Sequence, residues 1–533
     1  MEKTQETSRK QIIPSSVDRL SAFPDDVLCH ILSFLPTKTS VSTSILAQRW
    51  KLLWAHVPNI IFGHDRGSII PEIDIIYNKV FLRYRVKNMN TLRLFSNHDS
   101  TQSSKLSACI QDAVNRNVKE MHLFFSISYT FPRCILNCKT LVYLRLSGYG
   151  YITLMTVDDD DVWLPCLKKL FLDSVAFECE GTLSYLLSNC PVLDELIINR
   201  SYPDVNCFIV SSRTINRLIL DSPFYGFFNV NNRFMVKIDA PELRYLKVYD
   251  FAAKDVTVGS LTSLVEADVN FKGGENDDFD YHVDASVEDD ANDVSNDDND
   301  SVEDDANDVS DDDDDDDVSD DDDDDDDDDV SDDDDDDDDD DVSDDDDDVS
   351  DDDDFPDNNA LNDEAPPLGR DVLYARSVLE FVGGLCNVKY LRLSTKWMNV
   401  SDSEFSVWAA NYNNLIKLEF RGDWRFIPNF LQTADNLQVL RICTADTCYK
   451  HWIEPNQVPQ CLSTHLRTVR FDHFEIAEAE MNIIEYILRN AKVLKRMEIH
   501  SKGYGIDLEK KSEALDLISS FKQGSVECTL DFH

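Results

Sequence analysis

The stretch Leu141-Val142-Tyr143-Leu144-Arg145-Leu146 decides the fold, because its spacing of apolar residues recurs along most of the chain. The spacing is Leu-x-x-Leu-x-Leu, with Ile, Val, Met or Phe accepted at the apolar places, and it occurs thirteen times. Eleven of the twelve steps between successive copies are 21 to 29 residues long, and such regularity indicates a repeat architecture. The copies begin at Met89, Val118, Leu141, Leu167, Leu193, Ile215, Leu243, Leu264, Val388, Leu415, Leu437, Leu466 and Leu494.

Each copy predicts a short β-strand with two unlike faces. Successive side chains of a strand alternate, so the fourth and sixth residues of a copy point to one side and the third and fifth to the other. Stacked copies bury the apolar side at roughly 1.5 to 3 kcal/mol for each large side chain. Segments with helical spacing lie between copies, as at residues 183–187, 377–382 and 430–433. We therefore expect an α/β leucine-rich-repeat solenoid, in which a curved parallel sheet has helices outside and a concave inner surface.

The inner surface is the expected recognition surface, and its fifth positions carry more basic than acidic residues. Phe171, Ile197 and Ile219 give this row an apolar centre. Arginine pairs well with carboxylates and phosphates, so we interpret the row as a surface for a protein segment with acidic groups near a hydrophobic anchor. The alternative is a mixed, solvated face. The predicted target-binding residues are Arg93, Arg145, Phe171, Lys247, Arg392, Arg441 and Arg470.

The net charge of −54 comes from one segment of the 533-residue chain. Residues 275–364 hold 55 of the 104 acidic residues and no Lys or Arg, which leaves 49 acidic against 50 basic residues elsewhere. The rest of the chain is therefore close to neutral, and we expect no specific nucleic-acid partner. The like charges of the tract predict disordered chain.

The position of the acidic tract indicates an insertion between two repeats. Without its ninety residues, the step between the copies at Leu264 and Val388 shortens from 124 to 34 residues. We expect the solenoid to continue across it, because the cost of closing a long loop rises only with the logarithm of its length. Phosphorylation by acidophilic kinases, weak cation association, competition with a target for the basic row, and a tolerated simple repeat with no function remain open as roles for the tract.

The sequence contains no pattern typical of an enzyme or a membrane protein. We find no glycine-rich phosphate loop, no Cys or His set with metal-ligand spacing, and no catalytic triad context, so we expect no catalysis and no cofactor. No apolar stretch approaches the 18 residues of a membrane span. Thirteen scattered cysteines without a signal-peptide pattern predict reduced thiols in the cytoplasm or nucleus.

The N-terminal part predicts a small helical module. Pro24, Asp25 and Asp26 suit the first turn of a helix, and Pro36 suits its end. A second helical stretch is expected across Val41 to Leu53. Two or three short helices have a thin core, so an apolar face left over indicates a partner, although a helical cap on the solenoid is the alternative.

Two segments resemble a known family. The run from Leu20-Ser21-Ala22-Phe23-Pro24-Asp25-Asp26-Val27-Leu28 to Ser44-Ile45-Leu46-Ala47-Gln48-Arg49-Trp50 resembles the F-box of plant F-box/leucine-rich-repeat proteins. Phe471-Asp472-His473-Phe474, the helix expected after it, and Gly524-Ser525-Val526-Glu527-Cys528 resemble the FBD region that ends many of them, without the glycine often found after the aromatic residue. The domains expected are a disordered N-terminus (1–17), an F-box (18–62), repeats (85–274), the disordered acidic insertion (275–364), further repeats (365–455) and an FBD-like region (456–533).

The resemblance implies a non-catalytic substrate receptor of an SCF-type ubiquitin ligase. In that family the F-box binds a Skp-type adaptor, and through it cullin and RING subunits, while the repeats bind a protein target. The alternative is a non-degradative binding protein whose acidic loop engages basic partners such as histones or ribosomal proteins. By analogy, the residues that form or support the adaptor-binding face are Pro24, Leu28, Ile31, Leu32, Leu35 and Trp50.

Overall fold

The computed structural model describes most of the chain outside its N-terminus and the acidic tract. The described residues are 20, 22–62, 76–96, 103–125, 131–154, 162–177, 179–200, 207–221, 235–249, 255–259, 261–271, 369–395, 408, 410–443, 452–501 and 508–533. The expected disorder of residues 1–17 and 275–364 lies outside these ranges, and the domain limits given above stay predictions.

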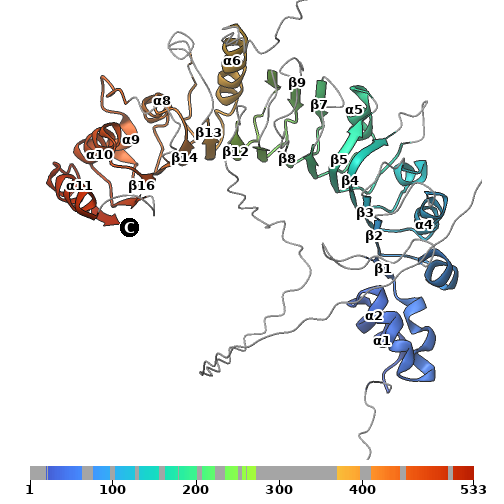
Figure 1. The fold of residues 1–533 in the computed structure, drawn as a ribbon. Helices are drawn as coiled ribbons and strands as arrows, with labels where there is room; N and C mark the ends of the chain where they lie inside the picture. Colours follow the sequence, from blue (N-terminus) through green and yellow to red (C-terminus); the bar gives the residue numbers. More distant parts are fainter. Residues whose placement is uncertain are drawn as a thin grey trace, which may run out of the picture. The chain divides into compact units, whose positions relative to one another are not determined.

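A parallel sheet of fifteen strands is the main element of the fold (Figure 1). Every one of the thirteen sequence copies begins a strand at its third residue, which confirms the repeat prediction. These strands are β2(Thr91–Ser96), β3(Glu120–Phe125), β4(Tyr143–Leu154), β5(Lys169–Phe177), β6(Glu195–Asn199), β8(Arg217–Asp221), β10(Tyr245–Tyr249), β12(Glu266–Asn270), β13(Tyr390–Ser394), β14(Lys417–Arg421), β15(Val439–Cys443), β16(Thr468–Phe474) and β17(Arg496–Ser501). The sequence pattern missed the two edge strands, β1(Asn59–Phe62) and β18(Thr529–Phe532).

The sheet continues directly across the acidic tract, as the spacing predicted. Strand β12 pairs in parallel with β13, and Glu266 lies opposite Tyr390. Residues 1–276 and 365–533 belong to one compact unit. The hydrogen-bonded ladder therefore joins residues on both sides of the tract.

Burial alternates along the strands as the pattern requires. In β6 the side chains of Leu196 and Ile198 are buried, whereas Glu195, Ile197 and Asn199 are partly exposed. The buried fourth and sixth residues of the copies join one continuous hydrophobic core. This core is the energetic reason that the repeats stack.

Helices cover one face of the sheet over most of its length (Figure 1). They include α10(Glu478–Asn490), in which the buried Glu480 accepts hydrogen bonds from the backbone N–H groups of Glu475 and Ala477 and so caps the helix start. The helical segments expected at 183–187, 377–382 and 430–433 fall within α5(Gly181–Ser188), α6(Gly369–Gly384) and α8(Phe426–Thr433). The helical elements after the N-terminal module are η3(Ile76–Val80), η4(Phe81–Arg83), α4(Ser103–Asn115), η6(Arg133–Asn137), α5(Gly181–Ser188), α6(Gly369–Gly384), α8(Phe426–Thr433), α9(Gln460–Thr464), α10(Glu478–Asn490) and α11(Leu508–Ser520).

Three repeats carry a strand where a helix or irregular turn was expected. The strands β7(Cys207–Ser211), β9(Met235–Asp239) and β11(Asp255–Val258) form a second parallel sheet in the order β11-β9-β7. Helix α5 packs against β7, and helix α6 packs against β11. Strict alternation in β9, with Val236 and Ile238 buried between exposed neighbours, favours a strand because its period is two residues.

The N-terminal module consists of α1(Asp25–Ser33), α2(Thr37–Ser42), η1(Thr43–Ile45) and η2(Gln48–His56). The expected helix near 25–35 is thus present, but the expected stretch from Val41 to Leu53 is divided among α2 and two 3₁₀ helices. The extended backbone of Ala47 (φ −160°, ψ 165°) separates η1 from η2 and interrupts the helical path there.

Candidate functional site

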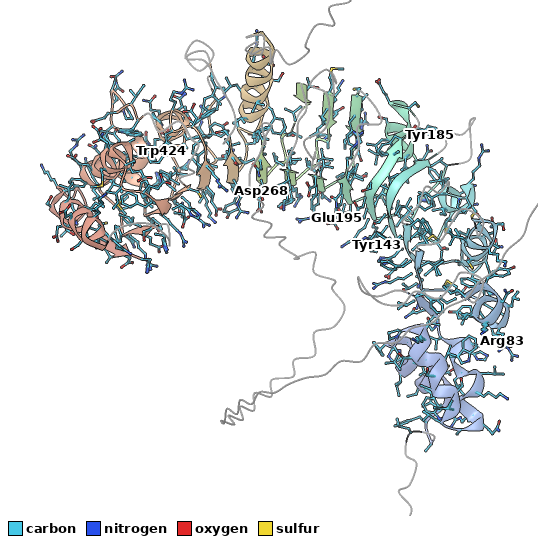
Figure 2. The ribbon with its side chains drawn as sticks, viewed as in Figure 1. Arg83, Tyr143, Tyr185, Glu195, Asp268 and Trp424 are labelled. Carbon is cyan, nitrogen blue, oxygen red and sulfur yellow. The ribbon has the colours of Figure 1, made fainter. Side chains whose placement is uncertain are left out.

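The face of the main sheet that carries the third and fifth residue of each copy is called here the open face. Figure 2 shows Tyr143, Glu195 and Asp268 on this face, while Tyr185 and Trp424 lie on the opposite side among the helices. Parallel register places the fifth residues of neighbouring copies directly opposite one another, as with Asp268 and Arg392. The chemistry of the open face therefore depends on which charges become neighbours in that row.

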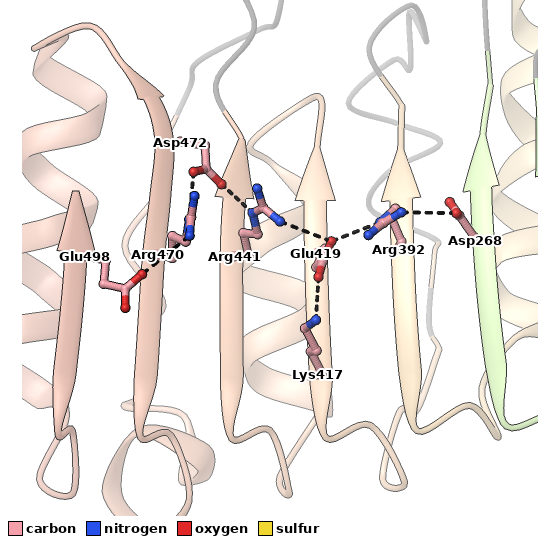
Figure 3. Close-up of polar contacts among 8 residues, drawn as sticks. All are labelled: Asp268, Arg392, Lys417, Glu419, Arg441, Arg470, Asp472 and Glu498. Atoms are coloured by element: carbon pink, nitrogen blue, oxygen red, sulfur yellow. Dashed lines mark hydrogen bonds and ion pairs between the residues drawn. The ribbon is translucent and has the colours of Figure 1, made fainter. Parts of the chain in front are cut away.

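The C-terminal half of the open face carries a charge ladder across six strands, drawn in Figure 3. Arg392 contacts Asp268 at 3.4 Å and Glu419 at 2.9 Å. Arg441 contacts Glu419 at 3.7 Å and also binds Asp472. Arg470 contacts Asp472 at 2.7 Å and Glu498 at 3.6 Å. The members of this charge ladder are Asp268, Arg392, Lys417, Glu419, Arg441, Arg470, Asp472 and Glu498.

The carboxyl groups of the ladder differ in how well they are compensated. Burial raises the pKa of Asp472, but hydrogen bonds from Arg441 and Arg470 outweigh burial and hold this pKa below its usual value. The pKa of Glu419 is also lowered, since the Lys417 and Arg392 contacts outweigh its burial. In contrast, burial dominates at Asp268 and raises its pKa despite Arg392. Asp472 and Glu419 are therefore the well-compensated anions of the ladder.

The centre of the open face has a second set of paired charges in the row of third residues. Glu195 contacts Lys169 at 3.1 Å and Arg217 at 3.0 Å. The Arg217 guanidinium also lies 3.9 Å from the centre of the Tyr245 ring. These cations are occupied by partners within the protein.

The N-terminal half of the fifth-residue row is different. Arg93, His122, Arg145 and Phe171 lie opposite one another on the neighbouring strands β2 to β5. Among the described residues, no carboxylate forms an ion pair with Arg93 or Arg145. The Arg145 guanidinium instead stacks 4.2 Å above the Phe171 ring.

The N-terminal module exposes large apolar side chains. Its own core is small and consists of Leu28, Leu32, Trp50, Leu53 and Val57. We call the exposed apolar side chains of α1, of Phe34 directly after it, and of Ile45 and Leu46 at the end of η1 the exposed apolar set. Within this set Phe34 is 64% exposed, Ile45 88% and Leu46 64%, and its members are Val27, Ile31, Phe34, Ile45 and Leu46.

Comparison with known proteins gives the same three-part organisation. Residues 20–62 match the F-box domain, residues 106–266 match the LRR repeats of FBD-associated F-box protein At5g56370, and residues 454–499 match the FBD. F-box/LRR-repeat protein At4g14103 of Arabidopsis thaliana is 33% identical over 275 residues, which cover 49% of this chain and 69% of that protein. The chain belongs to the plant F-box/LRR-repeat/FBD family.

Two other Arabidopsis thaliana relatives show how much of the chain is shared. F-box/LRR-repeat protein At3g59200 is 34% identical over 268 residues, so the match spans 48% of this chain and about half, 50%, of that relative. Putative FBD-associated F-box protein At3g50710 is 25% identical over 546 residues, covering 96% of this chain and 99% of that protein.

In this F-box/LRR-repeat/FBD chain, the six predicted adaptor-binding residues fall into two groups. Leu28, Leu32 and Trp50 are buried in the small F-box core. Pro24 and Ile31 are exposed, and Leu35 is partly exposed. The sequence prediction missed Phe34, Ile45 and Leu46 as surface residues, because helical spacing does not distinguish a side chain of a thin core from one left outside it.

The seven predicted target-binding residues also divide. Arg392, Arg441 and Arg470 are already paired in the charge ladder, and Lys247 lies opposite Asp268. Arg93 and Arg145 lie in the half of the row that lacks such pairs. Phe171, expected as part of an apolar centre, is buried beneath Arg145. The sequence signal that could have separated these groups is that acidic fifth residues, Asp268, Glu419 and Glu498, occur only after Lys247.

The described residues show neither a metal-binding cluster nor a membrane-spanning helix. In the part of the chain that the structure describes, no group of three or more His, Cys, Asp or Glu residues is arranged to hold a metal ion. None of the helices built from these residues has the length and apolar character needed to cross a membrane. The described cysteines form no disulfide bond with one another.

Proposed function

We propose that this protein is a substrate receptor of an SCF-type ubiquitin ligase. The F-box binds a Skp-type adaptor, and through it the cullin and RING subunits, while the open face of the repeats binds a protein target. The chain carries out no catalysis itself and acts by holding the target near the catalytic subunits. We expect it in the cytoplasm, the nucleus or both.

The exposed apolar set is the observation that supports adaptor binding. Large apolar side chains that remain exposed near one another indicate an interaction surface. Val27, Ile31 and Phe34 are spaced four and three residues apart, so they share one side of α1. A partner that covers such side chains gains about 2 kcal/mol for each one fully buried.

The test is co-purification and affinity measurement with a plant Skp-type adaptor, using the full-length chain. The informative variant is Phe34→Asp combined with Ile45→Asp, because both residues are exposed and neither contributes to the F-box core. Loss of two covered side chains at about 2 kcal/mol each weakens binding by far more than tenfold. Substitution of Leu28 or Leu32 would be uninformative, since these residues are 0% and 1% exposed and their loss disrupts the core itself.

Val526→Asp is the matched control, because Val526 is a fully exposed apolar residue near the C-terminus. We expect this variant to bind the adaptor like the wild type. A wild-type chain that binds no Skp-type adaptor, or a Phe34/Ile45 variant that binds as tightly as the control, contradicts the proposal.

A further inference from the structure

The fifth-residue row of the open face divides into cations that have acidic partners and cations that do not. Arg392, Arg441 and Arg470 each contact two carboxylates of the charge ladder. Arg93 and Arg145 contact none among the described residues, although they belong to the same row. This difference selects one end of the sheet as a site with positive charge available to a ligand.

The residue between the two guanidinium groups is His122. Register places Arg93 on one side of it and Arg145 on the other, so strands spaced about 4.8 Å apart hold the two arginines roughly 10 Å from each other. His122 is 8% exposed, and its Nε2 atom has no hydrogen-bond partner. The buried Nε of Arg93 also lacks a partner. A buried polar atom without a hydrogen bond costs about 1 to 3 kcal/mol, which a suitable ligand can recover.

Charge around His122 favours an anion. Burial, followed by the positive charges of Arg93 and Arg145, lowers the pKa of His122 to about 3, so the ring is neutral at physiological pH. Glu120 is the acidic residue two places earlier on β3, and it already accepts a hydrogen bond from Thr91 Oγ1 at 3.2 Å. Glu120 keeps its negative charge when it accepts this bond, so Arg93 and Arg145 outnumber the one carboxylate and this end of the row carries net positive charge.

An apolar strip adjoins the cationic group on the same face. Beyond Arg145 and the buried Phe171, the next residues of the row are Ile197 and Ile219, which are partly exposed. They lie three and four strands from His122, or roughly 14 to 19 Å at the usual strand spacing. An extended peptide rises about 3.3 Å per residue, so four to six residues cover that distance.

We propose that the cationic group of Arg93, His122 and Arg145 binds an anionic side chain of the target, a carboxylate or a phosphomonoester, and that Ile197 and Ile219 receive an apolar side chain four to six residues away. The proposal names the ligand chemistry of the target surface and so rests on the proposed receptor function. The arginines of the charge ladder already have carboxylate partners, so the proposal assigns them no ligand contact.

The test is fluorescence polarisation of labelled twelve-residue peptides with the full-length protein. Three peptides carry phosphoserine, glutamate or serine at one position and leucine five residues later, and a fourth replaces the leucine of the phosphoserine peptide with serine. We expect the phosphoserine or glutamate peptide to bind at least about tenfold more tightly than the serine peptide, a difference of about 1.4 kcal/mol. If only the phosphoserine peptide binds tightly, the ligand of the site is a phosphomonoester. If the phosphoserine and glutamate peptides both bind tightly, the site accepts any anionic side chain.

Three variants locate the site. Arg93→Gln and Arg145→Gln should each weaken the preferred peptide at least about tenfold, while Arg470→Gln, from the same row but paired in the charge ladder, changes its affinity less than twofold. The acidic tract is present in every variant, so any competition from it acts on all of them alike. Circular dichroism confirms that each variant remains folded.

Three results would overturn the proposal. The first is an equal loss of peptide affinity in Arg470→Gln and Arg145→Gln, and the second is equal binding of all four peptides. The third is that no peptide binds the wild type at about 1 mM, which is on the order of the weakest specific affinities. Adaptor affinity, measured in parallel, separates this failure from failure of the receptor function, because the F-box contains none of the substituted residues.

Discussion

Asp472 is the residue whose removal tests the charge ladder most directly. It accepts hydrogen bonds from Arg441 and, at 2.7 Å, from Arg470, and it is almost fully buried. A hydrogen bond to a charged group contributes about 1.5 to 3 kcal/mol, but both guanidinium groups are more than one third exposed and water screens them. We therefore expect Asp472→Asn to destabilise the sheet locally by about 2 kcal/mol at pH 7.

Hydrogen exchange measured by mass spectrometry suits this prediction, because neighbouring repeats open locally. A loss of about 2 kcal/mol lowers the protection factors of amides in β15 and β16 by roughly 30-fold. The folded pKa of Asp472 is lowered, so its stabilisation is present above the unfolded pKa of about 3.9 and is lost as the pH falls through the folded pKa. The free energies of unfolding of the wild type and the variant, measured with urea, should consequently become equal at a pH below the folded pKa of Asp472.

Asp268→Asn is the matched control within the same ladder. Burial raises the pKa of Asp268, so its charged form is poorly compensated, and Arg392 retains Glu419 when Asp268 is neutralised. We expect a change of less than about 0.5 kcal/mol, since partial relief of desolvation offsets the lost contact. The prediction would be refuted if both substitutions destabilised the protein equally, or if Asp472→Asn left the protection of amides in β15 and β16 unchanged. Either result would show that Asp472 is no better compensated than Asp268.

Three further predictions concern the scaffold. Gly422→Ala should lower the free energy of unfolding by about 2 to 3 kcal/mol, because Gly422 has φ +150° and an added Cβ would lie 3.0 Å from the backbone of the buried Thr395. An unchanged midpoint of urea unfolding would contradict this prediction. Glu480→Ala should cost about 3 kcal/mol, since it leaves the N–H groups of Glu475 and Ala477 without their acceptor, whereas Glu480→Gln retains one acceptor and should cost less. Deletion of residues 275–364 should raise the free energy of unfolding by about 2 kcal/mol, because shortening a loop roughly tenfold lowers its closure cost by that amount. Adaptor affinity should stay unchanged. If the deletion variant is unfolded, the tract supports the fold and the prediction is wrong.

The sequence alone determined the repeat architecture and the start of thirteen strands. It could do so because the two-residue alternation of a strand and the apolar residues that stack in the core are local properties, repeated at a nearly constant period. The repeat pattern did not include the second sheet of β7, β9 and β11, because these strands lie between the copies of the pattern. They also did not locate the interruption at Ala47, which leaves Ile45 and Leu46 on the surface.

Only the tertiary structure decided which charged residues are neighbours. Asp268 and Arg392 are 124 residues apart in sequence, yet parallel register brings their side chains to 3.4 Å. Coulomb attraction depends on this distance and on burial, not on separation along the chain. Each predicted arginine of the open face occupies the same place in its copy, but register pairs Arg392, Arg441 and Arg470 with carboxylates and leaves Arg93 and Arg145 beside a neutral histidine.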